Sequence, residues 1–385
     1  MADHRPLVMI SAGEASGDRH AASLFLELRK ILPDVRGIGM GGSAMREAGI
    51  DIRFDSSGIG VIGLAEIARH YGEIRGALSL MTSLARDERP DLLICVDYKE
   101  FNFRLAKAAK ALGIKVLFYV SPQVWAWRQG RVKSYGRIID HMAVIFPFEL
   151  PFYEAHGVPA TYVGHPLAGK VNATQSRDEV RAHMGLAGSD GPLIGLLPGS
   201  RTNEVARLLP TLLDAAVNIQ AHHRNAEFVV FRAPTLDAKS LVVAANARGL
   251  TLHVIEGQDY NVLAACDAVI TVSGTATLEV ALTGVPMVIV YRLASLSYWI
   301  GRMLVKVPYI GLPNILSDRG IVREFIQHEA TAENIAGEIN HILDDEDYRN
   351  VMRQDLLNVR AILGQREGSV ELARLAAEML AEPKA

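Results

Sequence analysis

Short runs of apolar residues alternate along the chain with longer segments in which apolar side chains recur every three or four positions. Apolar runs of this length predict buried strands of a parallel sheet, and the segments between them predict amphipathic helices. The predicted strands span residues 7–12, 91–97, 115–120, 141–146, 193–197, 227–231, 252–255, 268–272 and 286–290. This alternation predicts an α/β fold built from βαβ units.

A break in the pattern divides the chain. After about residue 164 the apolar strands stop, and the sequence predicts a connection and one helix, 176–184, before they restart. We therefore predict two doubly wound, Rossmann-like domains, over residues 1–168 and 169–354. The last segment, 355–385, is predicted to be helical and to cross back to the first domain. Such sheets bind ligands beyond the carboxyl ends of their strands, so we expect the domains to face a central cleft.

Composition narrows the class of protein. Of the 385 residues 49% are apolar and 22% charged, which excludes a disordered chain, and the net charge of −3 argues against nucleic acid as a partner. Cys95 and Cys266 each lie in an apolar run in a different half, so they predict inert core thiols. The N-terminus lacks the apolar region of a signal peptide, and we expect a cytoplasmic protein. A mean hydropathy of +0.15 leaves room for contact with a membrane surface.

Two glycine-containing turns follow apolar strands in the second domain, LLPGSR at 196–201 and SGTATLE at 273–279. Glycine lets the backbone approach an anion closely, and the first N–H groups of the next helix are unpaired donors. Arg201, beside Ser200, offers a planar fork for two phosphate oxygens. Gly274 and Thr275 open the second helix, and Glu279 lies one turn further on, where a carboxylate can hold a ribose diol. Together the turns predict a site for a nucleoside diphosphate.

The turn after the first strand, residues 10–18, has two interpretations. It is either an ordinary strand-to-helix turn with Ser16 or Asp18 as the helix cap, or a loop at the cleft whose Glu14 and Ser16 face a sugar. A glycine cluster at 37–42 matches the GxGxxG pattern, but it does not follow the first strand, and we interpret it as a close-packed turn.

Asp97 ends a strand, which places its carboxylate at the cleft end of the first sheet. A capping role is common for such an acid. Because Asn102 is better placed as the cap, the sequence leaves Asp97 without a structural duty and predicts a general base.

Two further regions allow both a packing role and a binding role. Trp125 and Trp127 end the strand 115–120 and precede Arg131, which predicts either domain-packing aromatics or a platform for a sugar or an anionic lipid. His165 has no partner at metal-ligand spacing, which favours a hydrogen-bonded hinge residue. Amphipathic stripes at 64–81 and 296–307 predict core helices or, for the second, an interfacial helix.

Eight motifs in order along nearly the whole chain resemble the lipid A disaccharide synthases. They are SAGEASGD at 11–18, VIGLAE at 61–66, VSPQVWAWR at 120–128, FPFE at 146–149, GHPL at 164–167, LPGSR at 197–201, SGTATLE at 273–279 and LPNIL at 312–316. The resemblance implies an inverting glycosyltransferase of the GT-B type. It would move 2,3-diacylglucosamine from UDP to the 6-hydroxyl of 2,3-diacylglucosamine 1-phosphate (lipid X), which yields UDP and a β-1′,6-linked disaccharide monophosphate.

The resemblance also assigns roles to residues. Asp97 matches the family's catalytic aspartate, and we place Glu14 with it. The first domain would bind the acceptor and lipid, and the second the UDP-sugar. The nucleotide-sugar residues are Arg201, Ser200, Gly274, Thr275, Glu279 and Asn314, and the acceptor or lipid residues are Ser16, Trp125, Arg128, Arg131, Trp299 and Arg302. No cofactor or metal is expected, and no Asp-x-Asp pair is present where one would be expected. The expected partners are UDP-2,3-diacylglucosamine, lipid X and the inner face of the bacterial cytoplasmic membrane, where the protein would associate peripherally.

The chain departs from the family at one motif. The usual Asp-x-Pro-Asp-Phe-Asn is here DYKEFN at 97–102, so that Lys99 and Glu100 replace Pro and Asp. Two alternatives stay open from the residues alone. One is another UDP-sugar enzyme of this fold, a UDP-N-acetylglucosamine 2-epimerase or the transferase that acts on lipid I, and the other is a catalytically silent nucleotide-sugar-binding scaffold at the membrane.

Overall fold

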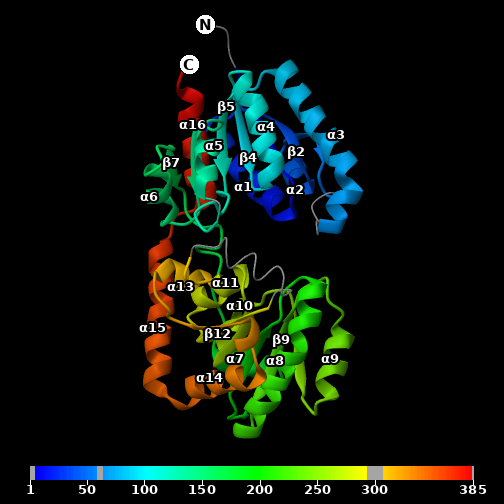
Figure 1. Ribbon diagram of the computed structural model, residues 1–385, viewed down its shortest axis with the longest axis vertical. Helices are drawn as coiled ribbons and strands as arrows, with labels where there is room; N and C mark the ends of the chain where they lie inside the picture. Colours follow the sequence, from blue (N-terminus) through cyan, green and yellow to red (C-terminus); the bar gives the residue numbers. More distant parts are fainter. Residues whose placement is uncertain (1–4, 59–63, 128, 293–306, 384–385) are drawn as a thin grey trace. The chain divides into compact units, whose positions relative to one another are not determined.

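The computed structural model describes residues 5–58, 64–127, 129–292 and 307–383, with the backbone alone over 64–70. It divides into two compact units (Figure 1). Unit 1 comprises Met1–Ala168 and Gln365–Ala385, and unit 2 comprises Gly169–Gly364. Among the described residues, no helix combines the length and the apolar character that crossing a bilayer requires.

Parallel strands form the sheet of unit 1, in the order β3-β2-β1-β4-β5-β6-β7 over the described residues. The strands are β1 (Leu7–Ala12), β2 (Arg36–Gly41), β3 (Asp51–Asp55), β4 (Leu92–Val96), β5 (Lys115–Tyr119), β6 (His141–Val144) and β7 (Ala160–Tyr162). The helices are α1 (Ala15–Ile31), α2 (Ser43–Glu47), α3 (Leu64–Glu88), α4 (Lys99–Ala111), α5 (Val132–Gly136), α6 (Glu149–Glu154) and α16 (Gly368–Ala381), with a 3₁₀ turn at Gln129–Arg131.

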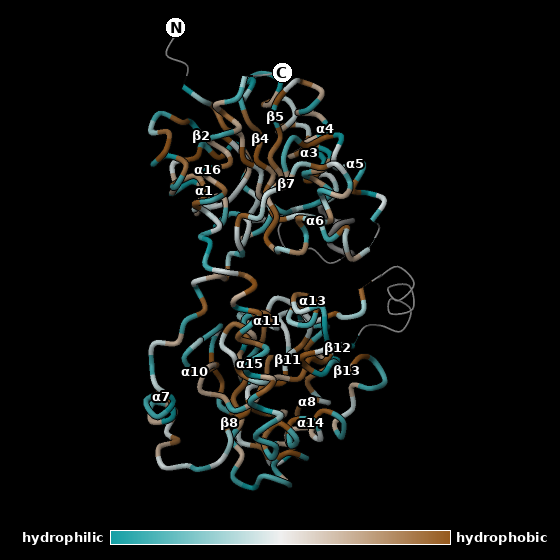
Figure 2. The backbone as a smooth tube through the Cα atoms, turned by 90° about the vertical axis from the view of Figure 1, so that its left-hand side faces the viewer, coloured by the Kyte–Doolittle hydropathy of each residue, from teal (hydrophilic) through white to brown (hydrophobic). Residues whose placement is uncertain are grey.

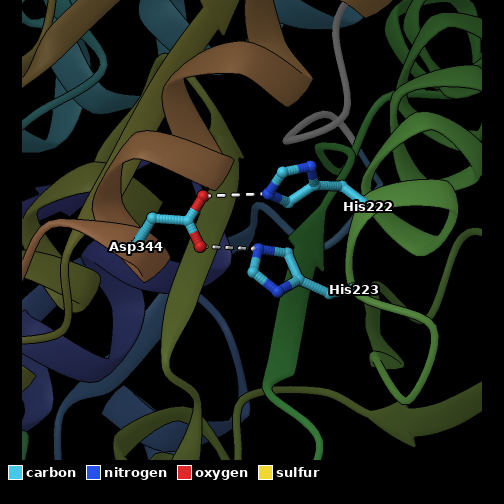
Figure 3. A group of neighbouring side chains, drawn as sticks. All are labelled: His222, His223 and Asp344. Atoms are coloured by element: carbon cyan, nitrogen blue, oxygen red, sulfur yellow. Dashed lines mark hydrogen bonds and ion pairs between the residues drawn. The ribbon is translucent and has the colours of Figure 1, made fainter.

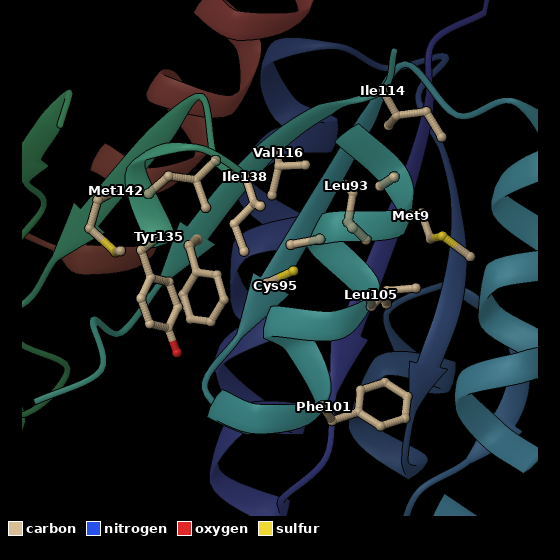
Figure 4. Packing of buried hydrophobic residues seen from close by; sticks show 14 of the residues in the cluster. Met9, Leu93, Cys95, Phe101, Leu105, Ile114, Val116, Tyr135, Ile138 and Met142 are labelled. Carbon is tan, nitrogen blue, oxygen red and sulfur yellow. The ribbon is translucent and has the colours of Figure 1, made fainter. Parts of the chain in front are cut away.

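Both faces of this sheet are buried. Successive residues of a strand point to opposite faces, so that Met9 packs with α3, α4 and α5 on one side, while Val8 and Ile10 pack with α1 and α16 on the other. Figure 4 shows the first of these clusters, in which side chains from β1, β4 and α4 meet Tyr135 and Ile138. Burial on both faces explains why these strands read as continuous apolar runs.

Unit 2 repeats the architecture, with the parallel order β10-β9-β8-β11-β12-β13. The strands are β8 (Leu193–Leu197), β9 (Glu227–Arg232), β10 (Leu252–Glu256), β11 (Ala268–Val272), β12 (Met287–Tyr291) and β13 (Arg323–Ile326). The helices are α7 (Arg177–His183), α8 (Thr202–His222), α9 (Ala238–Asn246), α10 (Tyr260–Ala265), α11 (Thr275–Thr283), α13 (Leu312–Ser317), α14 (Ala332–Asp344) and α15 (Glu346–Leu363), with a 3₁₀ turn at Gln327–Glu329. Hydrophobic residues line central strands such as β11, whereas α7 at the periphery is hydrophilic (Figure 2).

Two local predictions are wrong. The glycine cluster at 37–42 is not a turn: residues 37–41 belong to the strand β2, in which a Cβ on Gly39 would lie 1.9 Å from the carbonyl oxygen of Ile10, and Gly42 is the N-cap of α2. The glycines are therefore needed for close approach of neighbouring strands. Asp18 does not cap its own helix, whose N-cap is Glu14. Its buried carboxylate instead accepts hydrogen bonds from the N–H groups of Gly42 (2.7 Å), Ala44 (3.0 Å) and Met45 (3.2 Å), and so caps α2.

The predicted C-terminal helix is two helices. α15 ends at Leu363 in unit 2, because Gly364 adopts a φ of +62°. The chain then returns to unit 1, where α16 packs along α1.

Candidate functional site

Unit 2 contains a pocket of about 500 Å³ at the carboxyl ends of its central strands. Both predicted phosphate turns contribute to its wall. Its lining is Leu197, Gly199, Ser200, Arg201, Glu204, Phe231, Ala233, Pro234, Gly257, Gln258, Val272, Ser273, Gly274, Thr275, Ala276 and Tyr291.

The first turn leads from β8 into α8. Gly199 has a φ of +103°, which favours glycine, and a Cβ there would lie 2.8 Å from Oε2 of Glu204, so that this side chain would have to shift. Arg201 is the N-cap of α8 and makes no capping hydrogen bond with its side chain. The turn is anchored from behind, because the hydroxyl of Thr235 donates to the carbonyl oxygen of Ser200 at 2.6 Å.

The wall of the pocket carries both signs of charge. Arg201 is exposed, whereas Glu204, one turn into α8, is partly buried. Burial raises the pKa of Glu204, and the cations Arg201 and Arg207 oppose that rise. A diphosphate entering this pocket would meet a guanidinium and a helix N-terminus, with one carboxyl group at the side.

The second turn leads from β11 into α11. Gly274 is the N-cap, with a φ of +153° that side chains rarely adopt, and Thr275 is the first helical residue. Ser273 donates from its hydroxyl to the carbonyl oxygen of Ile310 at 3.2 Å. The structure therefore brings the N-termini of α8 and α11 to one pocket, as the two turns predict for an anionic ligand.

Glu279 lies behind this wall rather than on it. It is 3% exposed and accepts hydrogen bonds from the Gln258 amide and, at 3.2 Å, from the Tyr260 hydroxyl. Burial raises the pKa of Glu279 to about 7, against the two hydrogen bonds. Gln258 separates the carboxyl group from the pocket, so a contact between Glu279 and a ribose stays a prediction.

Asn314 has a structural role, and its predicted contact with the nucleotide-sugar stays a prediction. Its side chain is fully buried, and its Nδ2 donates to the carbonyl oxygen of Val322 (2.9 Å) and to Glu324 (2.7 Å). Its Oδ1 accepts from the N–H groups of Ile321 (2.8 Å) and Val322 (3.0 Å). These four bonds saturate the side-chain amide and fix the start of β13 against α13.

Asp97 lies at the carboxyl end of β4 in unit 1, in a strained turn. Both Asp97 and Tyr98 have a positive φ, 47° and 45°, a conformation that costs about 1–3 kcal/mol per non-glycine residue. The N–H of Asp97 donates to the carbonyl oxygen of Tyr119 at 3.0 Å. Its side chain is partly buried, and no hydrogen bond or ion pair from the described residues engages the carboxylate.

Asn102 holds this turn, and the prediction that it caps a helix is wrong, because Tyr98 is the N-cap of α4. Asn102 is fully buried and donates to the carbonyl oxygens of Asp97 (2.7 Å), Val96 (3.3 Å) and Ser11 (3.3 Å). It also accepts from the Ser11 hydroxyl at 2.7 Å. Asn102 thus ties the ends of β1 and β4 together and fixes the backbone of Asp97.

The loop after β1 lies beside that turn. Gly13 packs directly under the Tyr98 ring, because a Cβ there would lie 2.3 Å from the ring. Burial raises the pKa of Tyr98, and the nearby charge of Glu14 adds to the effect. Glu14, the N-cap of α1, and Ser16, in the first turn of that helix, are exposed at the same end of the sheet as Asp97.

Trp125 has a packing role in the structure, and its predicted contact with the acceptor or lipid stays a prediction. It is 8% exposed, stacks edge-on against Phe148, and donates its indole N–H to Glu149 at 3.0 Å. Glu149 also accepts from Ser121 and from two backbone N–H groups, and burial raises its pKa to about 7. Trp127 is 38% exposed.

Arg131, which follows the two tryptophans, has a carboxylate partner. Arg131 pairs with Glu100 at 2.5 Å and lies over the Phe103 and Tyr135 rings. Glu100, which replaces the family's aspartate, is therefore a partner of Arg131. The predicted residues Arg128, Trp299 and Arg302 lie outside the described residues, as does most of the stripe at 296–307.

The first amphipathic stripe belongs to the core over its described side chains. Met81 is fully buried, and Ile74 and Leu78 pack against the same cluster, whereas Tyr71 is 55% exposed.

His165 is buried, and its Nδ1 accepts from the N–H of Leu167 at 3.1 Å, while burial lowers its pKa to about 4. The structure thus shows His165 hydrogen-bonded, as predicted, and its role as a hinge residue stays a prediction. Cys95 and Cys266 are buried free thiols, as predicted.

Comparisons with known proteins identify the family. The family model of lipid-A-disaccharide synthetase matches residues 8–379. A lipid-A-disaccharide synthase of Nitrosococcus oceani is 49% identical over 364 residues, which cover 94% of each chain. Among solved structures, the kitacinnamycin glycosyltransferase has a TM-score of 0.64 at 15% identity and covers 98% of this chain and 100% of its own.

The UDP-N-acetylglucosamine 2-epimerase of Neisseria meningitidis, solved with its UDP-sugar, has a TM-score of 0.63 at 12% identity, with 98% and 99% covered. These likenesses show the fold alone, which is of the GT-B class. Because the family model and the bacterial relative both span nearly the whole chain, the chain belongs to the lipid-A-disaccharide synthase family.

Proposed function

We propose that, in the synthesis of the lipid A disaccharide, unit 2 binds the UDP part of UDP-2,3-diacylglucosamine and that Asp97 of unit 1 is the general base. Membership of the family makes the chain a glycosyltransferase with a nucleotide-sugar donor and lipid X as acceptor. The observation that carries the proposal is the turn at 97–98. There a carboxylate without a described partner is held in a strained conformation by the buried amide of Asn102.

The reaction needs one proton transfer and one displacement. Asp97 would take the proton from the 6-hydroxyl of lipid X as that oxygen bonds to the anomeric carbon of the donor. The bond from that carbon to the diphosphate breaks on the opposite face, and UDP leaves with the electron pair. Such in-line geometry inverts the configuration and gives the β-1′,6 linkage.

The pocket of unit 2 would stabilise the departing diphosphate. Arg201 and the N–H groups that open α8 and α11 can offset the negative charge that grows on the leaving oxygen. Ser200, Gly274 and Thr275 line the same wall.

The substrates motivate a further proposal, that the protein associates peripherally with the cytoplasmic face of the membrane. Each substrate of the proposed reaction carries two acyl chains. Extracting them into water would cost ~0.8 kcal/mol for every buried methylene that becomes exposed, which docking at the bilayer avoids.

Release of UDP tests the function directly. Purified protein would be incubated with UDP-2,3-diacylglucosamine, with lipid X either supplied or withheld, and the released UDP would be quantified. The affinity of the protein for UDP would be measured separately. We expect UDP release only when lipid X is present. UDP binding without release under either condition would favour the silent scaffold, and conversion of the donor sugar without the acceptor would favour an epimerase.

A further inference from the structure

Two long helices of unit 2 end side by side. α8 ends at His222, with His223 as its C-cap, and α14 ends at Asp344. The two helices pack along each other. This brings the adjacent residues His222 and His223 beside Asp344, which lies 122 positions after His222 in the sequence.

The three side chains point toward a common centre (Figure 3). Nε2 of His222 lies 2.9 Å from Oδ2 of Asp344, and Nε2 of His223 lies 3.5 Å from Oδ1. One nitrogen or oxygen of each residue lies within 4.8 Å of those of the other two. Tetrahedral bonds of 2.0–2.2 Å would separate ligand atoms by ~3.3 Å, so small side-chain rotations suffice to place all three on one ion.

Two further observations indicate a cation. The carbonyl ends of α8 and α14 both lie here, and each helix dipole is negative at that end. In addition, Nε2 of His223 is buried and has no hydrogen-bond partner within the described residues. Its 3.5 Å contact with Asp344 is too long for a hydrogen bond of ordinary geometry, so the buried ring nitrogen still has a free lone pair or N–H for a ligand such as an ion.

We propose that His222, His223 and Asp344 bind a divalent transition-metal ion of the Zn²⁺ class. Two imidazoles and one carboxylate suit Zn²⁺, Ni²⁺ or Cu²⁺, whereas Mg²⁺ and Ca²⁺ require oxygen ligands. His222 and Asp344 are about half exposed, with side chains at 55% and 50%, so that water can complete the coordination and the ion can enter.

The site is structural rather than catalytic. α8 begins at the Arg201 turn of the nucleotide pocket and runs for 21 residues to His222, a distance of about 30 Å along the helix. The ion therefore joins the ends of two helices far from the pocket. Since the ion binds the folded state, it raises the thermal midpoint, and the increase grows with the logarithm of the free ion concentration once that concentration exceeds the dissociation constant.

Zinc binding by the full chain without a polyhistidine tag tests the proposal. Affinity would be measured by competition with a chromophoric chelator, together with the thermal midpoint with and without Zn²⁺, and the Co²⁺ form would be examined by visible absorption. We expect one ion per chain, a higher midpoint, and an affinity weakened at least about tenfold by Asp344→Asn and by His222→Gln. UDP release should be unchanged when the ion is removed.

His341→Ala is the matched control. His341 lies on the same helix and pairs with a neighbouring carboxylate, Asp345, at 3.5 Å, but it is not one of the three ligands. The zinc affinity of the His341→Ala variant should stay within about twofold of the affinity of the unsubstituted chain. If Asp344→Asn fails to fold, His222→Gln still decides the matter. An absence of saturable binding, or equal affinities in the ligand variants and the control, would show that the three side chains form an ordinary ion pair.

Discussion

At the scale of single residues, the candidate site residues are held by hydrogen bonds to residues that are remote in the sequence. The apolar run at 91–97 predicts that Asp97 ends a strand. The residue that fixes its backbone, Asn102, accepts a hydrogen bond from Ser11, which is 91 positions away in the sequence and therefore not part of that pattern. Trp125 and Asn314 were expected in binding roles because their motifs resemble the family. In the structure Trp125 donates a hydrogen bond to Glu149, and Asn314 donates one to Glu324. No pattern in the sequence indicates that these two glutamates are the partners.

Replacing Asp97 tests the general base. Asp97→Asn should fold normally, because asparagine tolerates a positive φ as well as aspartate does, and should lower kcat by about 10²–10⁴-fold. The measurement is lipid X-dependent UDP release. Glu100→Gln, three residues on and paired with Arg131, is the control and should keep kcat within about threefold. If Asp97→Asn were as active as this control, another group would have to be the base.

Glu279 predicts a pH dependence of stability. Burial raises its pKa from 4.5 to about 7 in the folded state, so its stabilising contribution is complete below pH 4.5 and is lost as the pH rises through 7. Glu279→Gln mimics the protonated form at every pH. We expect the free energy of unfolding of this variant, measured in urea between pH 5 and pH 8, to fall less with pH than that of the unsubstituted chain. Parallel pH profiles would contradict the buried, raised-pKa carboxyl group.

At the scale of elements, a strand can be predicted from the sequence when both of its faces are buried, because its residues then form a continuous apolar run. The central strands β1, β4, β8 and β11 are continuous apolar runs and were predicted. β3, β7 and β13 lie at sheet edges, where exposure permits charged or short sequences, and all three were missed. β2 was missed for another reason, since its alternate glycines read as a turn.

The glycines of β2 carry a prediction. In Gly39→Ala the new Cβ would meet the backbone oxygen of Ile10, which cannot move without separating β1 from β2. We expect a loss of about 1–3 kcal/mol or more in the free energy of unfolding. Gly76→Ala is the matched control, because nothing lies within 4 Å of its Cβ and it stands in a helix, where alanine should stabilise by about 0.5–1 kcal/mol. Equal unfolding midpoints for the two variants would mean that the strands are not in such close contact.

At the scale of the whole molecule, one glycine shapes the course of the chain. The pattern of 355–385 is continuously amphipathic and predicted one helix, yet Gly364 ends α15 in unit 2 and α16 is part of unit 1. A glycine within a helical pattern is a weak stop signal, and only the packing of α16 on α1 decides that the helix is interrupted here. Each unit carries a different part of the proposed reaction, the nucleotide pocket in unit 2 and Asp97 in unit 1.

The proposed attachment to membranes is also a property of the whole molecule, and the residues to replace in testing it are chosen from the sequence pattern. Trp299, Ile300 and Met303 lie outside the described residues, in a stripe that pairs apolar side chains with basic ones. Replacing all three by Ser should reduce co-sedimentation with anionic vesicles and raise the apparent KM for acylated substrates several-fold, while the affinity for UDP is unchanged. Attachment of the unsubstituted chain should weaken in high salt, because each basic residue near anionic lipid contributes about 1 kcal/mol that ions screen.

A matched triple variant separates this stripe from apolar surface in general. Val243, Val351 and Leu357 are 67%, 61% and 46% exposed on helices of unit 2, so their replacement by Ser removes accessible apolar area without opening the core. This control should sediment with vesicles like the unsubstituted chain. If both triple variants bind vesicles equally well, the stripe at 296–307 is not the contact. If the first variant unfolds while the control does not, the stripe is part of the core, since only buried side chains carry that much of the stability.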